Sequence, residues 1–349
     1  MQSLFLIASS LLCVFSFFNL LGIDKTLAIT QLGNFVGAWI VFIVLRIIGR
    51  SFLSLNISRL YWFCVALLVG TLIFGVQVKG ARRWIDIWFL HIQPSELFRA
   101  VFILYFAHLL SKKHIRTISF LNFLKIVAIA FIPIFCIFIQ PDLATAGVYA
   151  LIFLGLVLFS AVPKKYILYG VIIFMMLLPF GWMSLKGYQK DRIRSFIAPH
   201  QDIQGRSYNM TQAVITVGAG GFLGKGLGYG TQSNLNFLPE NHTDFVFSSL
   251  IEQFGFVGGV GLLSLYGVIC GTLVHSLWKM ISKGLLFVQS EFLYAVGFLI
   301  FILVHISVNI GMNLGLVPVA GITLPLVSYG GSAVLSWCIM SAILFDPRY

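Results

Sequence analysis

The sequence predicts an all-α protein that crosses a membrane about ten times. Of its 349 residues, 59% are hydrophobic and only 10% are charged, whereas soluble domains carry about 25% charged residues. The apolar residues form runs close to the length that a spanning helix needs, about 20 residues. Only short polar breaks and one longer loop separate these runs, so we expect residues 1–349 to form a single integral membrane domain.

The predicted spans follow one another along the whole chain. They cover residues 4–22, 27–48, 57–78, 95–110, 120–139, 142–161, 166–185, 244–276, 285–313 and 332–345. No convincing cleavage site follows the first run, so we interpret it as a span and not as a signal peptide. All five cysteines fall in apolar runs without a Cys-X-X-Cys pair, which gives no indication of a disulfide framework or a zinc site.

Positive charge predicts which side of the membrane each loop occupies. Lys and Arg gather in every second short connection, and that side is expected to be cytoplasmic: Arg46, Arg50, Arg59, Lys112, Lys113, Arg116, Lys125, Lys164, Lys165, Lys279 and Lys283. Both termini then lie in the cytoplasm. Because the net charge of +12 largely reflects this topology signal, no nucleic-acid partner is expected.

Two connections on the outer side also carry cations. One is the short 79–94 segment, which contains Arg82 and Arg83, and the other is the long loop 186–243 between the seventh and eighth spans. Long loops cross membranes largely regardless of charge, so the short segment is the more informative exception. Its cations indicate an anionic ligand on the outer face.

Two glycine-rich segments are not expected to form regular helices. The apolar 314–331 segment contains two prolines, and such backbone at membrane depth must be buried in protein or line a cavity. Residues 218–230 fit no nucleotide-binding pattern, because Ala219 and Gly226 stand where a P-loop needs Gly and Ser or Thr. We favour a flexible or close-packed loop here; the alternative is that its amides and Lys225 face a phosphate.

Several polar residues allow both a structural and a functional interpretation. Trp84 suits an interfacial anchor and Pro94-Ser95-Glu96 a helix start, but arginines beside a helix N-terminus also suit an anion. Asp142 is expected to cap a helix. Glu96 and Arg99 share a helix face and are candidates to pair. The stripe His305, Asn309 and Asn313 favours helix–helix contact over a site, and Glu252 and Gln253 within the eighth span need partners.

Asp244 is the carboxylate that we expect to carry chemistry. It ends a polar stretch where a loop meets the eighth span, and an ionisable group at a membrane boundary is a functional candidate. The alternative, an N-cap of that span, is about equally compatible with the pattern. No Ser-His-Asp order, HExxH motif or paired carboxylates can be picked out, which leaves chemistry by a single base.

Several motifs occur in one order across nearly the whole chain. They are Gly80-Ala-Arg-Arg-Trp-Ile85, Gln93-Pro-Ser-Glu96, Gln140-Pro-Asp142, Gly224-Lys-Gly-Leu-Gly-Tyr-Gly-Thr-Gln232, Leu238-Pro-Glu-Asn-His-Thr-Asp-Phe245, Asn309-Ile-Gly-Met-Asn-Leu-Gly315 and Pro325-Leu-Val-Ser-Tyr-Gly-Gly-Ser332. With these motifs the chain resembles the SEDS (shape, elongation, division and sporulation) family of peptidoglycan polymerases, and the elongation (RodA) type more than the division (FtsW) type.

The resemblance implies a glycosyltransferase of the bacterial inner membrane. Such an enzyme joins lipid II into glycan strands on the outer side, with inversion, and releases undecaprenyl diphosphate. The family's acidic residue falls on Asp244, the implied general base, and its other motifs fall on Trp84, Ser95 and Glu96. Further expected substrate contacts are Arg82, Arg83, Arg192, Arg194 and Lys225, which suit the diphosphate, and Glu240, His242, Thr243 and Ser328. Gln140 departs from the family, which commonly has Lys there.

The resemblance also implies partners and leaves two other functions open. The partners are membrane lipids and a class B penicillin-binding protein, a transpeptidase with a single span. No obligatory cofactor is expected, and a divalent cation, Mg²⁺ or Mn²⁺, is compatible with the chemistry. A lipid II flippase would transport without making polymer, and a non-catalytic scaffold for the transpeptidase would tolerate loss of the Asp244 carboxylate.

Overall fold

The computed structural model describes residues 1–49, 55–78, 81–87, 90–184, 187, 190, 206–235, 237–282 and 290–345. Its helices are α1 (Gln2–Leu21), α2 (Lys25–Ile48), α4 (Ile57–Phe74), α5 (Pro94–Leu110), the 3₁₀ helix η1 (Lys113–Thr117), α6 (Phe120–Ile139), α7 (Leu143–Leu158), α8 (Lys164–Ser184), α10 (Arg206–Gly220), α11 (Thr231–Asn234), α12 (Val246–Ser282), α13 (Ser290–Asn313) and α14 (Gly331–Leu344). Its strands are β1 (Val76–Val78), β2 (Ala81–Ile87) and β3 (Leu90–Ile92).

Every one of the predicted apolar runs contains a helix, so the helical class holds for the described residues. Six of these helices, α1, α2, α4, α6, α12 and α13, are long and apolar enough to cross a membrane, and α7 and α14 are shorter apolar helices. The number of crossings stays a prediction. The long outer loop is not featureless, because it contains α10 and α11.

The structure contains a small antiparallel sheet that the sequence pattern did not predict. The predicted third span, 57–78, ends at Phe74, and Val76–Val78 is already a strand. Strand β2 pairs with both neighbours, in the order β1-β2-β3, and Val76 lies opposite Trp84 in the register. The expected 79–94 loop is therefore mostly sheet, which fixes the position of Arg82, Arg83 and Trp84.

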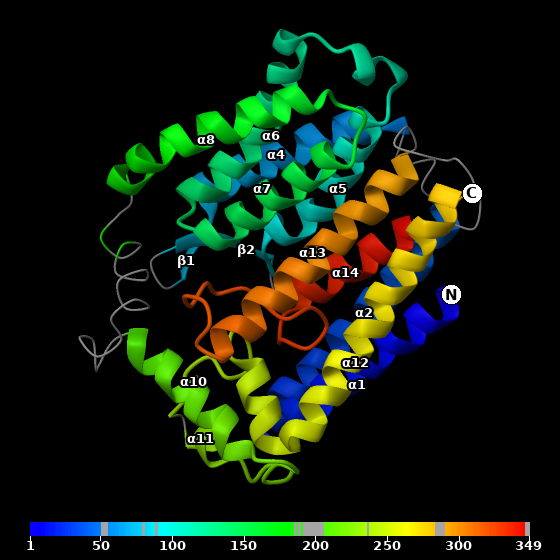
Figure 1. The fold of residues 1–349 in the computed structure, drawn as a ribbon. Coiled ribbons are helices and arrows are strands. Elements are labelled where there is room, and N and C mark those ends of the chain that lie inside the picture. The colour runs from blue at the N-terminus through cyan, green and yellow to red at the C-terminus, as the bar shows by residue number, and fades with distance from the viewer. Residues whose placement is uncertain are drawn as a thin grey trace.

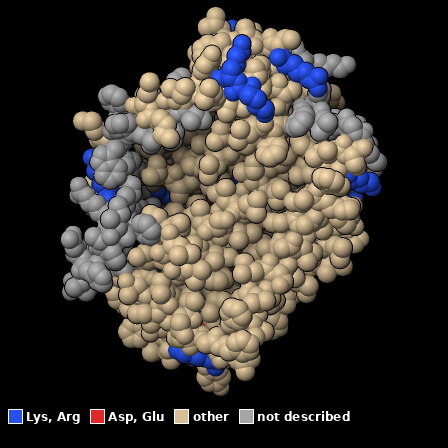
Figure 2. All heavy atoms as spheres, in the orientation of Figure 1, with Lys and Arg blue, Asp and Glu red and all other residues tan. Residues whose placement is uncertain are grey.

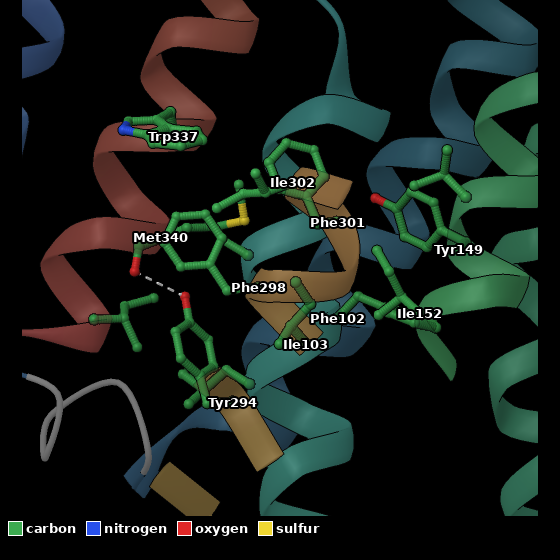
Figure 3. Close-up of a cluster of buried hydrophobic side chains, with 14 of the residues drawn as sticks. Phe102, Ile103, Tyr149, Ile152, Tyr294, Phe298, Phe301, Ile302, Trp337 and Met340 are labelled. Carbon is green, nitrogen blue, oxygen red and sulfur yellow. Dashed lines mark hydrogen bonds between the residues drawn. The ribbon is translucent and has the colours of Figure 1, made fainter. Parts of the chain in front are cut away.

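Aromatic residues form the core where α5, α7, α13 and α14 meet (Figure 3). The ring of Phe298 lies 5.3 Å from that of Trp337, and the ring of Phe102 lies 4.8 Å from that of Tyr149. The buried hydroxyl of Tyr294 donates to the carbonyl oxygen of Met340 at 3.1 Å, which satisfies its polar end. This packing holds α13 in place, and the polar residues of its last turns lead to the site described below.

The two chain ends lie at one end of the bundle, and α10 and α11 lie at the other (Figure 1). The rings of Phe5 and Phe345 are 4.9 Å apart, so the first turn of α1 contacts the end of α14. This agrees with the predicted topology, in which both termini share a side and the long loop is on the opposite side.

The surface in Figure 2 suits a lipid environment. Lys and Arg lie at its edges, the broad middle is uncharged, and no Asp or Glu is visible on this face. Large apolar side chains are exposed on several helices, such as Ile47 at 74%, Phe63 at 61% and Trp278 at 69%. Lipid chains would cover these side chains, whereas water would make their exposure unfavourable.

Helix α12 is interrupted at Gly255, where φ is 66° and ψ is −168°. The glycine-rich loop supplies the hydrogen bonds that the interruption removes. The amides of Lys225 and Gly226 donate to the carbonyls of Glu252 and Gln253, while those of Phe256 and Val257 donate to the carbonyls of Gly221 and Phe222. We expected a flexible or close-packed loop over 218–230: residues 218–220 belong to α10, and the backbone of 221–226 packs against the break. The polar backbone at the break is therefore satisfied.

Candidate functional site

Asp244 lies in the turn that leads into α12, and its main chain is held by α13. Its carbonyl oxygen accepts hydrogen bonds from the side-chain amides of Asn309 at 3.0 Å and Asn313 at 3.1 Å. The Asn313 oxygen accepts from the amide and the hydroxyl of Ser248, so a residue of α13 satisfies one of the free amides of the first turn of α12. The asparagine stripe therefore positions the Asp244 turn, in line with the structural role that the sequence favoured.

The Asp244 side chain is half-buried and adjoins the segment between α13 and α14. Its Oδ2 lies 3.5 Å from the position that a Cβ atom on Gly321 would occupy. The carbonyls of this segment are bonded by buried side chains: His305 contacts the carbonyl of Thr323 at 2.8 Å, and Asn309 donates to that of Ile322 at 2.7 Å. Residues 322–328 are thus mostly buried irregular backbone, as predicted, whereas residues 314–321 are half-exposed or exposed, with Leu316 at 68%.

The predicted residues Glu240, His242, Thr243 and Ser328 lie together around this turn. The Thr243 hydroxyl donates to Glu240 Oε2 at 3.0 Å. The Ser328 hydroxyl donates to the carbonyl of Thr243 at 2.6 Å and accepts from the amide of Leu324 at 2.8 Å. Ser328 is buried, so the structure gives it a positioning contact, and its expected contact with substrate stays a prediction.

The second group of predicted residues surrounds Asp142, at the start of α7. Arg83 forms an ion pair with Asp142 at 3.2 Å and donates to the carbonyls of Gln140 and Pro141. Asp142 also accepts from the amide of Thr145 at 3.1 Å, which confirms its predicted role as a helix cap. Arg83 therefore lies next to the motif where the family commonly has a lysine.

The remaining members of this group differ in exposure. Arg82 is exposed and Trp84 is half-buried. Ser95 and Glu96 are buried at the start of α5, where their carbonyls accept from the hydroxyls of Tyr149 and Ser336 respectively. Arg99, one turn further into α5, is buried with its guanidinium carbon 4.6 Å from the centre of the Phe301 ring.

The two groups are connected by the turn that precedes α14. Ser328 bonds to Thr243 in the first group, and four residues later the Ser332 hydroxyl accepts from the amide of Gln93, the N-cap of α5, at 3.1 Å. The structure therefore joins the Asp244 turn and the α5 entrance through one short segment. Arg192 and Arg194, which the sequence proposed as cations for the same site, lie outside the described residues.

Lys225 belongs to a separate arrangement around Glu252 of α12. Its ammonium group lies 3.1 Å from Glu252 Oε1 and 2.7 Å from the hydroxyl of Thr231. Glu252 is fully buried and also accepts from the amides of Gln232 and Ser233. Because a buried carboxylate already neutralises Lys225, this lysine is a weaker candidate for a phosphate than an exposed arginine.

Buried polar residues support these loops: Gln253, for which the sequence predicted a partner without naming it, and Asn19 and Ser249, which the sequence did not single out. Gln253 donates to the carbonyl and the side-chain oxygen of Asn19, and Asn19 donates to Ser249 at 3.1 Å. The Ser249 hydroxyl contacts the carbonyl of Asn241. Amides and hydroxyls inside apolar runs could have indicated such residues. Their partners could not be predicted, because they are far away in the sequence.

The cap at Asp142 predicts a loss of stability. Asp142→Ala removes the ion pair to Arg83 and the cap of α7 from a buried position, so we expect destabilisation by about 2 kcal/mol. The unfolding midpoint in detergent would measure it. The matched control is Asp24→Ala, because Asp24 caps α2 from an exposed position through the amide of Thr26. Equal midpoints for the two variants would contradict the assigned role.

The fold and the site together define a helical membrane protein with a polar turn region at one end of its helices. A family model described as cell cycle protein, FtsW/RodA/SpoVE, matches residues 2–347. The peptidoglycan glycosyltransferase MrdB of Escherichia coli K12 is 36% identical over 277 residues, covering 79% of this chain and 73% of MrdB. The protein of the same name from Helicobacter pylori J99 is 34% identical over 339 residues, covering 95% and 86%.

Solved structures agree with these relatives. One is a chain of a peptidoglycan synthase complex that coordinates polymerization and crosslinking, with a TM-score of 0.83, 27% identity and coverage of 98% of this chain and 96% of that one. Another is the rod-shape-determining protein RodA of Thermus thermophilus, with a TM-score of 0.71, 25% identity and coverage of 98% and 94%. The chain belongs to the FtsW/RodA/SpoVE family, the SEDS family, and is of the RodA type. It is a multi-pass membrane glycosyltransferase.

Proposed function

We propose that this peptidoglycan glycosyltransferase polymerises lipid II into glycan strands for cell-wall elongation, with Asp244 as the general base. The observation that carries the proposal is the place of Asp244. Its carboxyl group is half-buried beside the backbone of Gly321, and two asparagines of α13 fix its main chain. A base held in this way is already oriented before substrate binds.

The proposed reaction is one inverting displacement. The 4-hydroxyl oxygen of the GlcNAc of an acceptor lipid II forms a bond to the anomeric carbon of the donor strand. The bond from that carbon to the diphosphate oxygen breaks, and undecaprenyl diphosphate leaves with the electron pair. Asp244 takes the hydroxyl proton. Conversion of an α-linked diphosphate into a β-linkage in one step needs a base and a stabilised leaving group, but no covalent nucleophile.

The leaving diphosphate needs positive charge, and the described cations differ in how free they are to supply it. Arg82 is exposed. Arg83 is 24% exposed and bound to Asp142, and Lys225 is bound to Glu252. Arg82 is therefore the strongest described candidate, and Arg192 and Arg194 remain predicted contacts. The described residues contain no group of three or more His, Cys, Asp or Glu that could hold a metal ion; a bridging Mg²⁺ or Mn²⁺ would take ligands from the diphosphate itself.

The proposal places the site on the outer side of the inner membrane and gives the enzyme a partner. The orientation follows from the distribution of Lys and Arg, which gather in connections that the positive-inside rule therefore assigns to the cytoplasm. Examples in or next to these connections are Arg46, Lys112, Lys164 and Lys279. A structural neighbour is a chain of a synthase complex for polymerization and crosslinking. By analogy, we propose that a class B penicillin-binding protein binds this chain and crosslinks its product.

Purified protein reconstituted with lipid II, with and without the partner, tests this function. We expect a ladder of glycan strands on a gel, with more product when the partner is present. Transport of lipid II across vesicles without polymer would instead support a flippase. If polymer appeared only with the partner and in equal amount with Asp244→Asn, the chain would be a scaffold and the proposal would be wrong.

A further inference from the structure

A single glutamine of α2, Gln31, forms two hydrogen bonds to the turn 328–330. Gln31 is fully buried. Its Nε2 donates to the carbonyl of Ser328 at 3.3 Å, and its Oε1 accepts from the amide of Gly330 at 3.2 Å. One side-chain amide therefore bonds the main chain on both sides of Tyr329. A carboxamide can do this because it combines a donor and an acceptor at fixed separation.

The same turn holds the residues just before Asp244. The amide of Tyr329 donates to the carbonyl of His242 at 2.8 Å, and the rings of these two residues are 5.8 Å apart. The Ser328 hydroxyl donates to the carbonyl of Thr243. The carbonyls of His242 and Thr243 are thus both attached to the turn that Gln31 holds, and Asp244 is the next residue.

The turn has little freedom to move away from α2. The Asn34 side chain donates to Gln31 Oε1 at 3.2 Å, and a Cβ atom on Gly331 would lie 3.0 Å from the Asn34 oxygen. On the other side, the Ser16 hydroxyl of α1 donates to the carbonyl of Val327 at 2.8 Å. A displacement of the turn would therefore be passed to the His242–Asp244 backbone instead of being absorbed by empty space.

We infer that Gln31 is a positioning residue for glycosyl transfer: through the turn 328–330 it sets the place of the Asp244 carboxylate. This inference rests on the proposed function. Gln31 does not contact substrate, and its influence passes through hydrogen bonds to Ser328 and Gly330. Loss of these bonds should lower kcat, because the base is misplaced, while the affinity for lipid II is largely kept.

Two substitutions separate positioning from simple stability. In Gln31→Glu the protonated side chain keeps one donor and one acceptor, so it can replace the amide. The ionised side chain has only acceptors and faces the Ser328 carbonyl without a donor. The polymerisation rate of Gln31→Glu, divided by that of wild type, should therefore fall as pH rises. For Gln31→Leu, the polymerisation rate divided by that of wild type should be about tenfold lower at every pH. A tenfold loss corresponds to an increase of roughly 1.4 kcal/mol in the activation free energy.

Other titratable groups near the turn are Glu240 and Asp244 of the turn that Ser328 contacts, His242 and Tyr329 themselves, Asp24 and Lys25 at the start of α2, and His91, whose carbonyl accepts from Ser332. The pKa of Asp24 is lowered, chiefly by its hydrogen bonds to Thr26 and also by the charge of His242. These groups are present in wild type as well, so their titration largely cancels in the ratio. A matched control is Asn122→Asp, because Asn122 is exposed near the start of α6 and its ratio should not change with pH.

The outcome is read from polymerisation rates at several pH values, together with unfolding midpoints and lipid II binding. A ratio for Gln31→Glu that stays constant with pH, or a Gln31→Leu protein with the wild-type kcat, would overturn the inference. If Gln31→Leu does not fold, the pH series of Gln31→Glu still decides. An active wild type with insensitive variants would refute only the role of Gln31, whereas a wild type that makes no glycan would refute the proposed function as well.

Discussion

Asp244→Asn is expected to abolish glycan polymerisation while the protein still folds. The substitution keeps the shape of the side chain and the main-chain carbonyl to which Asn309 and Asn313 donate, so the turn should stay in place. What it removes is the proton acceptor for the attacking hydroxyl. A positioned base contributes a factor of about 10² to 10⁴ in rate, and we expect a loss in this range in initial rates measured with labelled lipid II.

The matched control is another carboxylate, Asp86. Asp86 lies in β2, is exposed and contacts His91 of β3, and its described hydrogen bond is to His91 and not to a residue of the Asp244 turn. Asp86→Asn should keep a rate close to that of wild type. Equal rates for the Asp244 and Asp86 variants would remove the basis for assigning the chemistry to Asp244.

Gly255→Ala is expected to disrupt the end of the bundle that contains α10 and α11. A Cβ atom at this position would lie 2.2 Å from the amide nitrogen of Gly224 and 2.5 Å from the carbonyl oxygen of Phe222. The backbone conformation, φ 66° and ψ −168°, is also one that only glycine adopts readily. Clash and strain together should destabilise the protein by about 3 kcal/mol or more, which unfolding midpoints and limited proteolysis of residues 206–245 would detect.

A second glycine of the same helix provides the control. Gly267 is exposed, and no atom lies within 4 Å of the position that a Cβ atom on it would occupy. Gly267→Ala should leave stability unchanged or raise it slightly, because alanine favours a helix more than glycine does. An unfolding midpoint for Gly255→Ala equal to that of Gly267→Ala would show that the break in α12 does not depend on glycine.

The helical part of the fold was predictable because span length and apolar composition are local properties of the sequence. The sheet was not, because β1 has only three residues and continues the apolar run of α4. The break in α12 was also hidden. Gly255 lies inside the predicted eighth span, 244–276, two residues after Gln253. The hydrogen bonds that compensate for the break come from residues 221–226, about 30 residues earlier in the sequence.

The site was predictable in part, for the same reason. The position of Asp244 between loop and helix can be read locally, and so can the cap formed by Asp142. The residues that hold the Asp244 turn cannot be read locally. Asn309 and Asn313 are more than 60 residues away from Asp244 in the sequence, and Gln31 bonds to Gly330 almost a full chain length away. The counter-ion of Lys225 was equally hidden, because Glu252 lies in another predicted element.

The central claim is that the carboxyl group of Asp244 removes a proton during sugar transfer, and one paired measurement tests it most directly. Bound lipid II and newly formed glycan are quantified in the same reconstituted samples of wild type and Asp244→Asn. We expect both proteins to bind lipid II equally and only wild type to extend it into strands. Strands of normal length and yield from the variant would contradict the account.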